Sequence, residues 1–359
     1  METFFEKLRA QAMSGKGIGA ADALAVLSLP DEALWRLLDV TDAVRRRFHG
    51  DSVRLCSILN AKSGACPEDC SFCSQSSRSR AEIPTYPLLP GEEIFRAAVE
   101  AKGWGARSFS IVTSGLSLRS REELVRVGDA VERIGKELGL ETCASVGTLS
   151  PADAQYLVSR GLRRVHHNLE TSRSYFPNVC TTHDYDDDVA TLRVAKAAGA
   201  RVCSGGVFGL GESPEDRVEL ALTLRELDVD SIPANFLNPI PGTPVEGRRE
   251  LSPIGCLRIL AMLRLTNPAK EILVCGGREV NLRSLQPLMF AAGASGAMAG
   301  DYLTTAGRPA EEDLRMLEDL GLKPQNRDVD EFSASLGTEM GTAEPGRKKD
   351  SRTAEPGRR

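Results

Sequence analysis

The chain has 359 residues, enough for two domains of about 150 residues each or for one larger α/β domain. Apolar residues make up 41% and charged residues 26% of it, a composition that argues against a disordered or fibrous chain. With 45 Lys and Arg against 50 Asp and Glu, the net charge is -5, so neither a nucleic acid nor an anionic membrane surface is expected as a partner.

Membrane and export signals are weak. The most apolar stretch, residues 287–300, is 14 residues long and interrupted by Gly and Ser, too short for a membrane-spanning helix. Charged residues such as Glu2, Glu6 and Lys7 precede no continuous apolar run, so we expect no secretory signal and a cytoplasmic protein. The nine cysteines favour metal or redox chemistry over a disulfide framework, because their number is odd and the compartment reducing.

Residues 1–50 precede the first predicted strand and are predicted to form two or three helices. Their apolar faces would come from Leu24, Leu27, Leu34, Leu37 and Leu38. We expect a helical extension that packs on the following domain and carries no catalytic residue.

From residue 51 onward, short β-branched or apolar runs alternate with longer segments of helical period, which is typical of parallel strands joined by crossover helices. Eight strands are predicted, centred on residues 53–59, 108–112, 142–146, 164–168, 201–207, 231–236, 272–275 and 295–299. The predicted helices include residues 91–102, 120–138, 185–198, 214–227 and 252–265. Eight β/α units match an α/β fold of the (β/α)₈ TIM-type barrel class over residues 51–322, with a doubly wound open sheet as the alternative.

The C-terminal segment, residues 323–359, changes to a composition of Gly, Pro and charge. The hexapeptide TAEPGR occurs at residues 342–347 and again at 353–358, and it offers nothing to bury. We expect this tail to be disordered.

The most informative motif is the run Cys66-x₃-Cys70-x₂-Cys73, which directly follows the first predicted strand. In a barrel this loop lies at the C-terminal face, where active sites gather. Three thiolates hold three irons of a [4Fe–4S] cluster and leave the fourth iron open, since full protein ligation uses four cysteines. A structural zinc site is the alternative, but it needs a fourth Cys or His, and residues 74–91 contain none.

With Phe72 as its aromatic residue, this motif is similar to that of the radical S-adenosylmethionine enzymes. The resemblance implies that the open iron binds the amino and carboxylate groups of S-adenosylmethionine. It also implies that an electron from the cluster cleaves this cofactor to a 5′-deoxyadenosyl radical. Phe72 would then lie near the adenine, although plain packing is the other explanation for an aromatic residue there.

Longer runs narrow the resemblance to the biotin synthase family. They are GACPEDCSFCSQS at 64–76, NLET at 168–171, VCSGGVFGLGE at 202–212, GGRE at 276–279 and LTT at 303–305. The resemblance covers about residues 50–322. It implies a homodimeric barrel that inserts sulfur into dethiobiotin, with the sulfur taken from an auxiliary iron–sulfur cluster. An electron donor such as flavodoxin or ferredoxin is implied as well.

The resemblance also assigns binding residues for the cofactor. Asn168 and Glu170 would hold the ribose hydroxyls, at a position where the family more often has Asp than Glu. Gly205 and Gly206 lack the spacing and the acidic partner of a dinucleotide-binding motif. We expect these two glycines to allow close approach of the backbone to the nucleoside.

For the substrate, the resemblance places Asn235 at the ureido ring of dethiobiotin and Thr304 and Thr305 at its carboxylate. The alternative for the threonine pair is a capping role at the next helix. His166 and His167 are interpreted as packing residues or as partners of functional side chains, because an isolated imidazole is more often hydrogen-bonded than bound to metal.

The family's usual auxiliary cluster is [2Fe–2S], held by three cysteines and one arginine. By the resemblance, Cys143, Cys203 and Arg278 match three of those positions, and Arg278 would act at the catalytic centre with Asn235. The remaining cysteine position is Ser110, and a neutral hydroxyl is a poor ligand for iron.

Two further cysteines, Cys275 and Cys180, could complete the ligand set. Cys143, Cys203 and Cys275 fall on predicted strands 3, 5 and 7, and alternate strands of a barrel supply one interior layer. With Cys180 from the loop after strand 4, four thiolates would suit a four-iron cluster. The alternative is that Cys275 and Cys180 are small buried apolar side chains. The cysteines expected to be core residues are Cys56 and Cys256.

Two other functions remain open at this point. One is a different radical enzyme of the same barrel type, which matures a hydrogenase cofactor or rearranges an amino acid. The other is a structural protein that binds zinc at Cys66, Cys70 and Cys73. A buried second cluster favours the sulfur-inserting reaction over both, because neither alternative needs a source of sulfur.

Overall fold

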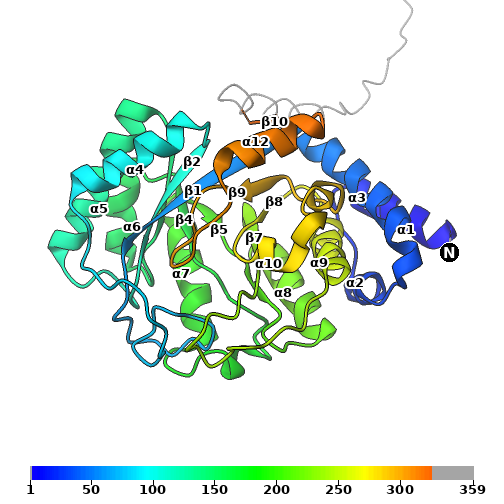
Figure 1. Cartoon of the computed structure of the whole chain (residues 1–359), viewed down its shortest axis with the longest axis horizontal. Coiled ribbons are helices and arrows are strands. Elements are labelled where there is room, and N and C mark those ends of the chain that lie inside the picture. The colour runs from blue at the N-terminus through cyan, green and yellow to red at the C-terminus, as the bar shows by residue number, and fades with distance from the viewer. Residues whose placement is uncertain (1, 326–359) are drawn as a thin grey trace, which may run out of the picture. The chain divides into compact units, whose positions relative to one another are not determined.

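The computed structural model describes residues 2–325, and the predicted disordered tail falls largely on residues outside this part of the chain. The N-terminal segment forms α1 (Glu2–Met13), α2 (Ala20–Leu27), the 3₁₀ turn η1 (Asp31–Ala33) and α3 (Leu34–His49). These helices lie against α8, α9 and α11 at the outside of the barrel (Figure 1). The backbone of Ile18 donates to the carbonyl of Leu265 at 2.9 Å, and Thr41 Oγ1 donates to that of Ala291 at 2.6 Å.

The strands that follow the N-terminal helices form a closed parallel barrel. They are β1 (Ser52–Lys62), β2 (Ser108–Thr113), β3 (Glu141–Ser145), β4 (Arg164–His166), β5 (Arg201–Cys203), β6 (Gly206–Phe208), β7 (Ser231–Phe236), β8 (Glu271–Val274) and β9 (Gly296–Met298). The sheet runs in the order β1-β2-β3-β4-β5-β7-β8-β9, and β9 pairs with β1 to close it. The predicted barrel is confirmed, and the open-sheet alternative is wrong.

One predicted strand, over residues 201–207, is divided into β5 and β6. The backbone N–H of Gly205 donates to the side-chain oxygen of Asn168 at 3.2 Å instead of continuing the ladder. β6 then pairs with β7 on its own. The division therefore follows from a side-chain acceptor that competes with the neighbouring strand.

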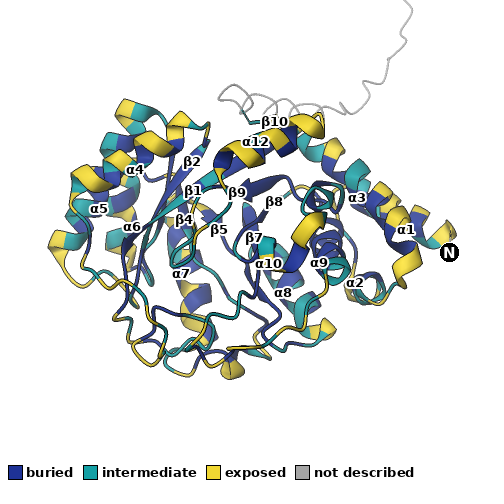
Figure 2. Ribbon diagram, in the orientation of Figure 1, coloured by how far each residue is buried: buried dark blue, intermediate teal, exposed yellow. Residues whose placement is uncertain are grey.

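Helices cover the outside of the barrel. They are α4 (Gly91–Gly103), α5 (Arg121–Arg133), α6 (Pro151–Ser159), α7 (Tyr185–Ala197), α8 (Pro214–Glu226), α9 (Pro253–Thr266), α10 (Arg278–Leu282), α11 (Leu288–Ala291) and α12 (Ala310–Asp319), with turns η2 (Ile134–Leu138), η3 (Phe176–Asn178) and η4 (Arg283–Leu285) and the short strand β10 (Lys323–Pro324). Figure 2 shows buried faces turned to the barrel and exposed faces turned outward, as amphipathic helices require. Between residues 2 and 325 there is no helix whose length and apolar content would let it cross a membrane.

A buried arginine ties α9 to the base of the barrel. The fully buried guanidinium of Arg264 donates to the carbonyls of Gly293, Pro268 and Lys270 at 2.8, 2.9 and 2.7 Å, and to Ser295 Oγ at 3.2 Å. Burial lowers the pKa of Arg264 to about 9. These bonds join the helix to the segments that enter β8 and β9, so they fix where two strands begin.

We expect Arg264→Met to lower the free energy of unfolding by about 3 kcal/mol, because the substitution strands several buried carbonyls. Arg258→Met is the control on the same helix. Arg258 pairs with the exposed Asp31, so its loss should cost less than about 1 kcal/mol. Urea unfolding followed by circular dichroism measures both, and equal losses would contradict this account of α9.

Candidate active site

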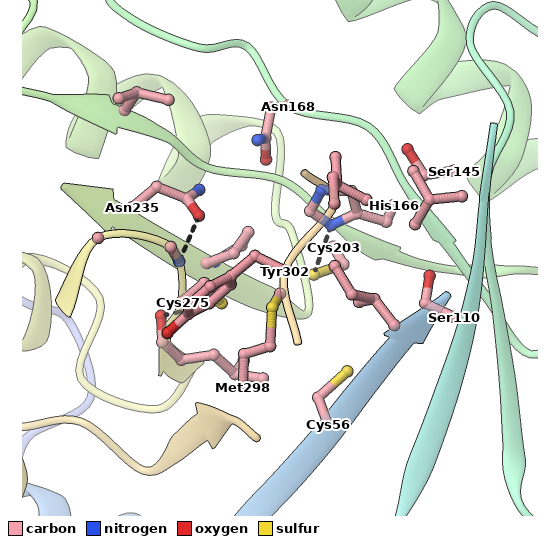
Figure 3. Close-up of a pocket in the computed structure, with 18 of the residues that line it drawn as sticks. Cys56, Ser110, Ser145, His166, Asn168, Cys203, Asn235, Cys275, Met298 and Tyr302 are labelled. Carbon is pink, nitrogen blue, oxygen red and sulfur yellow. Dashed lines mark hydrogen bonds between the residues drawn. The ribbon is translucent and has the colours of Figure 1, made fainter. Parts of the chain in front are cut away.

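A cavity of about 310 Å³ occupies the inside of the barrel and opens at the carboxyl ends of the strands (Figure 3). Eleven of the residues singled out from the sequence line it. They are Phe72, Cys73, Ser110, Cys143, Asn168, Glu170, Cys203, Asn235, Cys275, Thr304 and Thr305. Because these residues come from many strands and loops, the closed barrel is what brings them together.

The loop after β1 carries the motif with three cysteines. The backbone of Cys66 donates to the carbonyl of Gln75 at 3.1 Å, and that of Cys73 donates to the carbonyl of Cys70 at 2.9 Å, so the loop folds back on itself. Burial, together with the nearby Cys66, raises the pKa of Cys73 to about 11. Cys70 also interacts with Cys73. The three thiols therefore form one group, and this donor set fits an iron–sulfur cluster.

Cys180 lies beside this loop and not among the thiols inside the barrel. Its Sγ is 3.3 Å from Asp69 Oδ1 and 3.3 Å from His183 Nδ1, and a hydrogen bond from Cys70 lowers its pKa to about 6. Asp69 also accepts from the backbone of Thr181 at 2.8 Å, which holds the loop after β4 in place. Among the described residues, Cys180 is not part of the cavity wall. The structure thus corrects the expectation that Cys180 joins Cys143, Cys203 and Cys275.

Glu68, Cys180 and His183 place one possible metal-ligand atom each within 4.8 Å of one another. Hydrogen bonds already account for this arrangement. His183 Nδ1 lies 2.6 Å from Glu68 Oε2, and its other ring nitrogen lies 3.5 Å from Asp188 Oδ2. The two carboxylates, with Asp188 contributing most, raise the pKa of His183 to about 10. These hydrogen-bonded side chains therefore hold the loop after β4 in place next to Cys70.

Four other thiols line the cavity, namely Cys56, Cys143, Cys203 and Cys275. The strand register places Cys56, Cys143 and Cys203 at one level of β1, β3 and β5, and Leu273 holds this level on β8. Cys275 lies two residues further on, one layer nearer the mouth. Two expectations change. Cys56 lines the cavity and is not a core residue. Cys275 lies one layer above the other three thiols and not in the same layer.

Burial raises the pKa of each of these four thiols. Arg54 and Arg164 oppose this effect at Cys143, because their positive charge favours a thiolate. His166 Nδ1 lies 3.3 Å from Cys203 Sγ (Figure 3), as expected for a residue that supports a functional side chain. Each of the four thiols also interacts with at least one of the others, so they form a second group of donors.

Arg278 lies near Cys275, whose thiolate its charge favours, but its side chain is held by other partners. Its fully buried guanidinium pairs with Asp313 of α12 and donates to Tyr302 Oη at 3.3 Å, and it is absent from the wall that the described residues build around the cavity. The ion pair with Asp313 competes with the expected ligation of an auxiliary cluster by Arg278, and that ligation stays a prediction. Ser110 does line the cavity, and its buried hydroxyl has no hydrogen-bond partner.

Asn168 and Glu170 lie together at the end of β4. Asn168 Nδ2 donates to Glu170 Oε2 at 3.3 Å. A Cβ atom at Gly205 would lie 2.0 Å from the carbonyl oxygen of Pro233, and one at Gly206 would lie 2.4 Å from that of Glu170. Neither glycine belongs to the cavity wall made by residues 2–325. Their absence of a side chain allows neighbouring strands to approach, which positions Glu170.

The cavity wall also presents an amide and two hydroxyls. Asn235 Oδ1 accepts from the backbone of Gly276 at 2.9 Å (Figure 3), and its Nδ2 donates to the carbonyl of Gly206 at 3.2 Å. Thr304 Oγ1 lies 2.9 Å from the hydroxyl of Ser74 in the cysteine loop. The next helix, α12, starts only after its N-cap at Pro309, so Thr304 and Thr305 do not cap it.

Several cavity residues did not emerge as site residues from the sequence, among them Arg54, Cys56, Arg164 and Tyr302. The period of two along β1 places Arg54 and Cys56 on one face and was the available signal for both. Tyr302 stands two residues before Thr304, in a segment without regular structure. No sequence pattern marked it.

Comparisons with known proteins agree with this geometry. The Radical SAM superfamily matches residues 61–224, and the Biotin and Thiamin Synthesis associated domain matches residues 233–323. Biotin synthase of Geotalea uraniireducens (strain Rf4) is 51% identical over 326 residues, covering 91% of this chain and 99% of that protein. Biotin synthase of Geobacter sulfurreducens is 52% identical over 322 residues, covering 90% and 98%.

Solved structures show the same fold. The crystal structure of methylornithine synthase has a TM-score of 0.79 and 25% identity, covering 91% of this chain and 99% of its own. A maturase of the [FeFe]-hydrogenase has a TM-score of 0.76 and 16% identity, covering 93% and 78%. The barrel is therefore shared among enzymes that carry different names.

The partly buried Glu170 generates a prediction about pH. Burial and the nearby Asp188 raise its pKa from 4.5 to about 7. Between these values the folded protein binds a proton that the unfolded chain does not, so stability falls as the pH rises, by on the order of 3 kcal/mol. Glu170→Gln should therefore raise the melting temperature at pH 8 and leave it nearly unchanged at pH 4.5. An equal effect at both pH values in thermal unfolding would contradict this assignment.

Proposed function

Because the chain belongs to the biotin synthase family, within the radical S-adenosylmethionine superfamily, we propose that it inserts sulfur into dethiobiotin and so forms biotin. The observation that carries this proposal is the second group of thiols inside the barrel, beneath the loop with three cysteines. Methylornithine synthase and the hydrogenase maturase share the fold, but a reaction without sulfur transfer has no use for this buried set. The second group of thiols also disfavours a structural zinc protein.

Cys66, Cys70 and Cys73 would hold a [4Fe–4S] cluster, leaving one iron for S-adenosylmethionine. When bound, these two groups supply the 5′-deoxyadenosyl radical. Phe72 lines the cavity next to Cys73 and would pack against the adenine. Glu170 accepts a hydrogen bond from Asn168 and would accept others from the ribose hydroxyls. The barrel wall shields the sides of the cavity, and a reactive radical needs such protection from solvent.

The substrate would lie against Asn235, Thr304 and Thr305, which line the cavity. The amide of Asn235 has a donor and an acceptor, as recognition of a ureido ring requires, and the hydroxyls of Thr304 and Thr305 would donate to a carboxylate. Asn235 is held by backbone groups on both sides, so its amide is oriented before the substrate binds.

The auxiliary cluster would be held by Cys56, Cys143, Cys203 and Cys275, where it supplies sulfur. This set replaces the one expected from the sequence, which contained Cys180 and Arg278. Four thiols suit a four-iron cluster better than the [2Fe–2S] cluster typical of the family.

The family resemblance supports three further proposals. The first is a low-potential electron donor such as flavodoxin or ferredoxin. The second is a homodimer. The third is a cytoplasmic location, because the reducing compartment keeps the nine cysteines free as thiols.

The purified protein should convert dethiobiotin to biotin under anaerobic conditions with iron, sulfide, S-adenosylmethionine and a reductant. In Cys70→Ala, formation of 5′-deoxyadenosine should be lost, because the cluster needs all three thiolates to leave a single iron open. Chromatography with mass detection measures both products. Unimpaired cofactor cleavage in Cys70→Ala would exclude this loop as the cluster site. Cofactor cleavage without biotin in the wild type would exclude the substrate.

The auxiliary ligand set predicts a separation of two activities. Cys56→Ala and Cys275→Ala should each lose auxiliary iron and biotin formation but keep cofactor cleavage. Cys180→Ala is the matched control, because it removes a thiol from outside the cavity, and it should keep the auxiliary iron. Ser110→Ala should keep the auxiliary iron. It should change the free energy of unfolding by at most about 1 kcal/mol, since the hydroxyl has no hydrogen-bond partner to lose. Iron analysis and Mössbauer spectra that show auxiliary iron lost in Cys180→Ala or Ser110→Ala but kept in Cys56→Ala would refute the set.

A further inference from the structure

The floor of the cavity, beneath the thiols, carries two buried arginines. Arg54 on β1 and Arg164 on β4 both line the cavity and are only 5% and 3% exposed. Arg54 stands two residues before Cys56 on the same face of β1. Arg164 is the register partner of Cys143 on β3. Arg54 therefore lies one layer below Cys56, and Arg164 lies beside Cys143.

Two glutamates hold these arginines from the other side. Glu141 lies 2.8 Å from Arg54 Nη2 and 2.9 Å from Arg164 Nε, and Glu271 lies 3.4 Å from Arg54 Nη1 and 3.1 Å from Arg164 Nη2. Each carboxylate thus bridges both guanidinium groups. In the described part of the chain neither glutamate contributes to the cavity wall. The network is neutral as a whole, but its positive side faces the thiols.

One further contact connects this floor to a thiol. Arg164 Nη1 donates to Ser231 Oγ at 2.5 Å, and Ser231 hydrogen-bonds the thiol of Cys203. Ser231 is also the register partner of Cys203. Arg164 therefore acts on the thiol of Cys203 in two ways, directly through its charge and indirectly through the hydroxyl of Ser231, which it polarises.

We propose that Arg54 and Arg164 are positioning residues that stabilise the auxiliary cluster as a buried anion and raise its reduction potential. This inference rests on the proposed function. A cluster held by four thiolates carries a net negative charge, and burying such a charge is unfavourable unless an opposite charge lies close. Reduction adds one more electron, so a nearby cation favours the reduced form. The net charge and the hydrogen bonds to sulfur are known to set cluster potentials.

A purely structural role is the alternative, in which the four charges only close the bottom of the barrel. The two roles differ in the sign of their effects. If the charges act on the cluster, then removing a cation and removing an anion must shift the potential in opposite directions. If they only close the barrel, both changes weaken the fold alike.

The experiment uses the full chain with both clusters reconstituted and the first cluster as internal reference. Arg164→Gln combined with Glu271→Gln keeps the network neutral but removes one of the two positive charges that face the cavity. We expect its auxiliary cluster to have a more negative midpoint potential than the wild type in an anaerobic redox titration followed by EPR. Glu271→Gln alone should shift this potential in the positive direction. Arg164→Lys keeps the charge and should stay near the wild type. The first cluster should not change in any variant.

Unchanged potentials, or shifts of one sign in all variants, would overturn the inference. If the double variant takes up no auxiliary iron but Arg164→Lys does, the requirement for a cation is upheld. If both lack it, the arginine is structural and the inference fails. A wild-type protein that takes up no second cluster overturns the proposed function itself, and that result is obtained before any variant is compared.

Discussion

The pairing of β9 with β1 is the constraint on which the other features of the molecule depend. In this pairing Gly296 stands opposite Arg54 and Met298 opposite Cys56. A Cβ atom at Gly296 would lie 2.8 Å from the carbonyl oxygen of Arg54, so the last strand can approach the first only because this residue is glycine. Closure turns the inner face of every strand toward one space, and the thiols of distant strands thereby become neighbours.

Closure also sets how the loops at the mouth meet. The cysteine loop after β1 is tied to the loop after β9 by the contact between Ser74 and Thr304, and Asn60 Nδ2 donates to the carbonyl of Leu303 at 2.8 Å. On its other side, Ser71 donates to the carbonyl of Val179 at 2.8 Å. Hydrogen bonds thus join the loops that carry the proposed cofactor and substrate sites.

The polar and charged groups inside the barrel change in kind from the floor of the cavity to its mouth. Arginines paired with glutamates form the floor, thiols form the next level, and amide, carboxyl and hydroxyl groups surround the mouth. Buried charges are costly unless they are paired, and the network at the floor meets this condition without occupying the cavity. The interior therefore combines a fixed electrostatic field with room for bound groups, which is what preorganised sites require.

The sequence by itself determined the barrel, its helices and the loop with three cysteines, because periodicity and short spacing are local properties that folding preserves. It also identified Asn168, Glu170, Asn235, Thr304 and Thr305, each of which the structure brings to the cavity. Only the tertiary structure decided which distant side chains meet. Cys56 joined the inner thiols, whereas Cys180 and Arg278 were drawn to Asp69 and Asp313. The register between strands and the position of acidic partners govern these choices, and neither can be read from spacing along one chain.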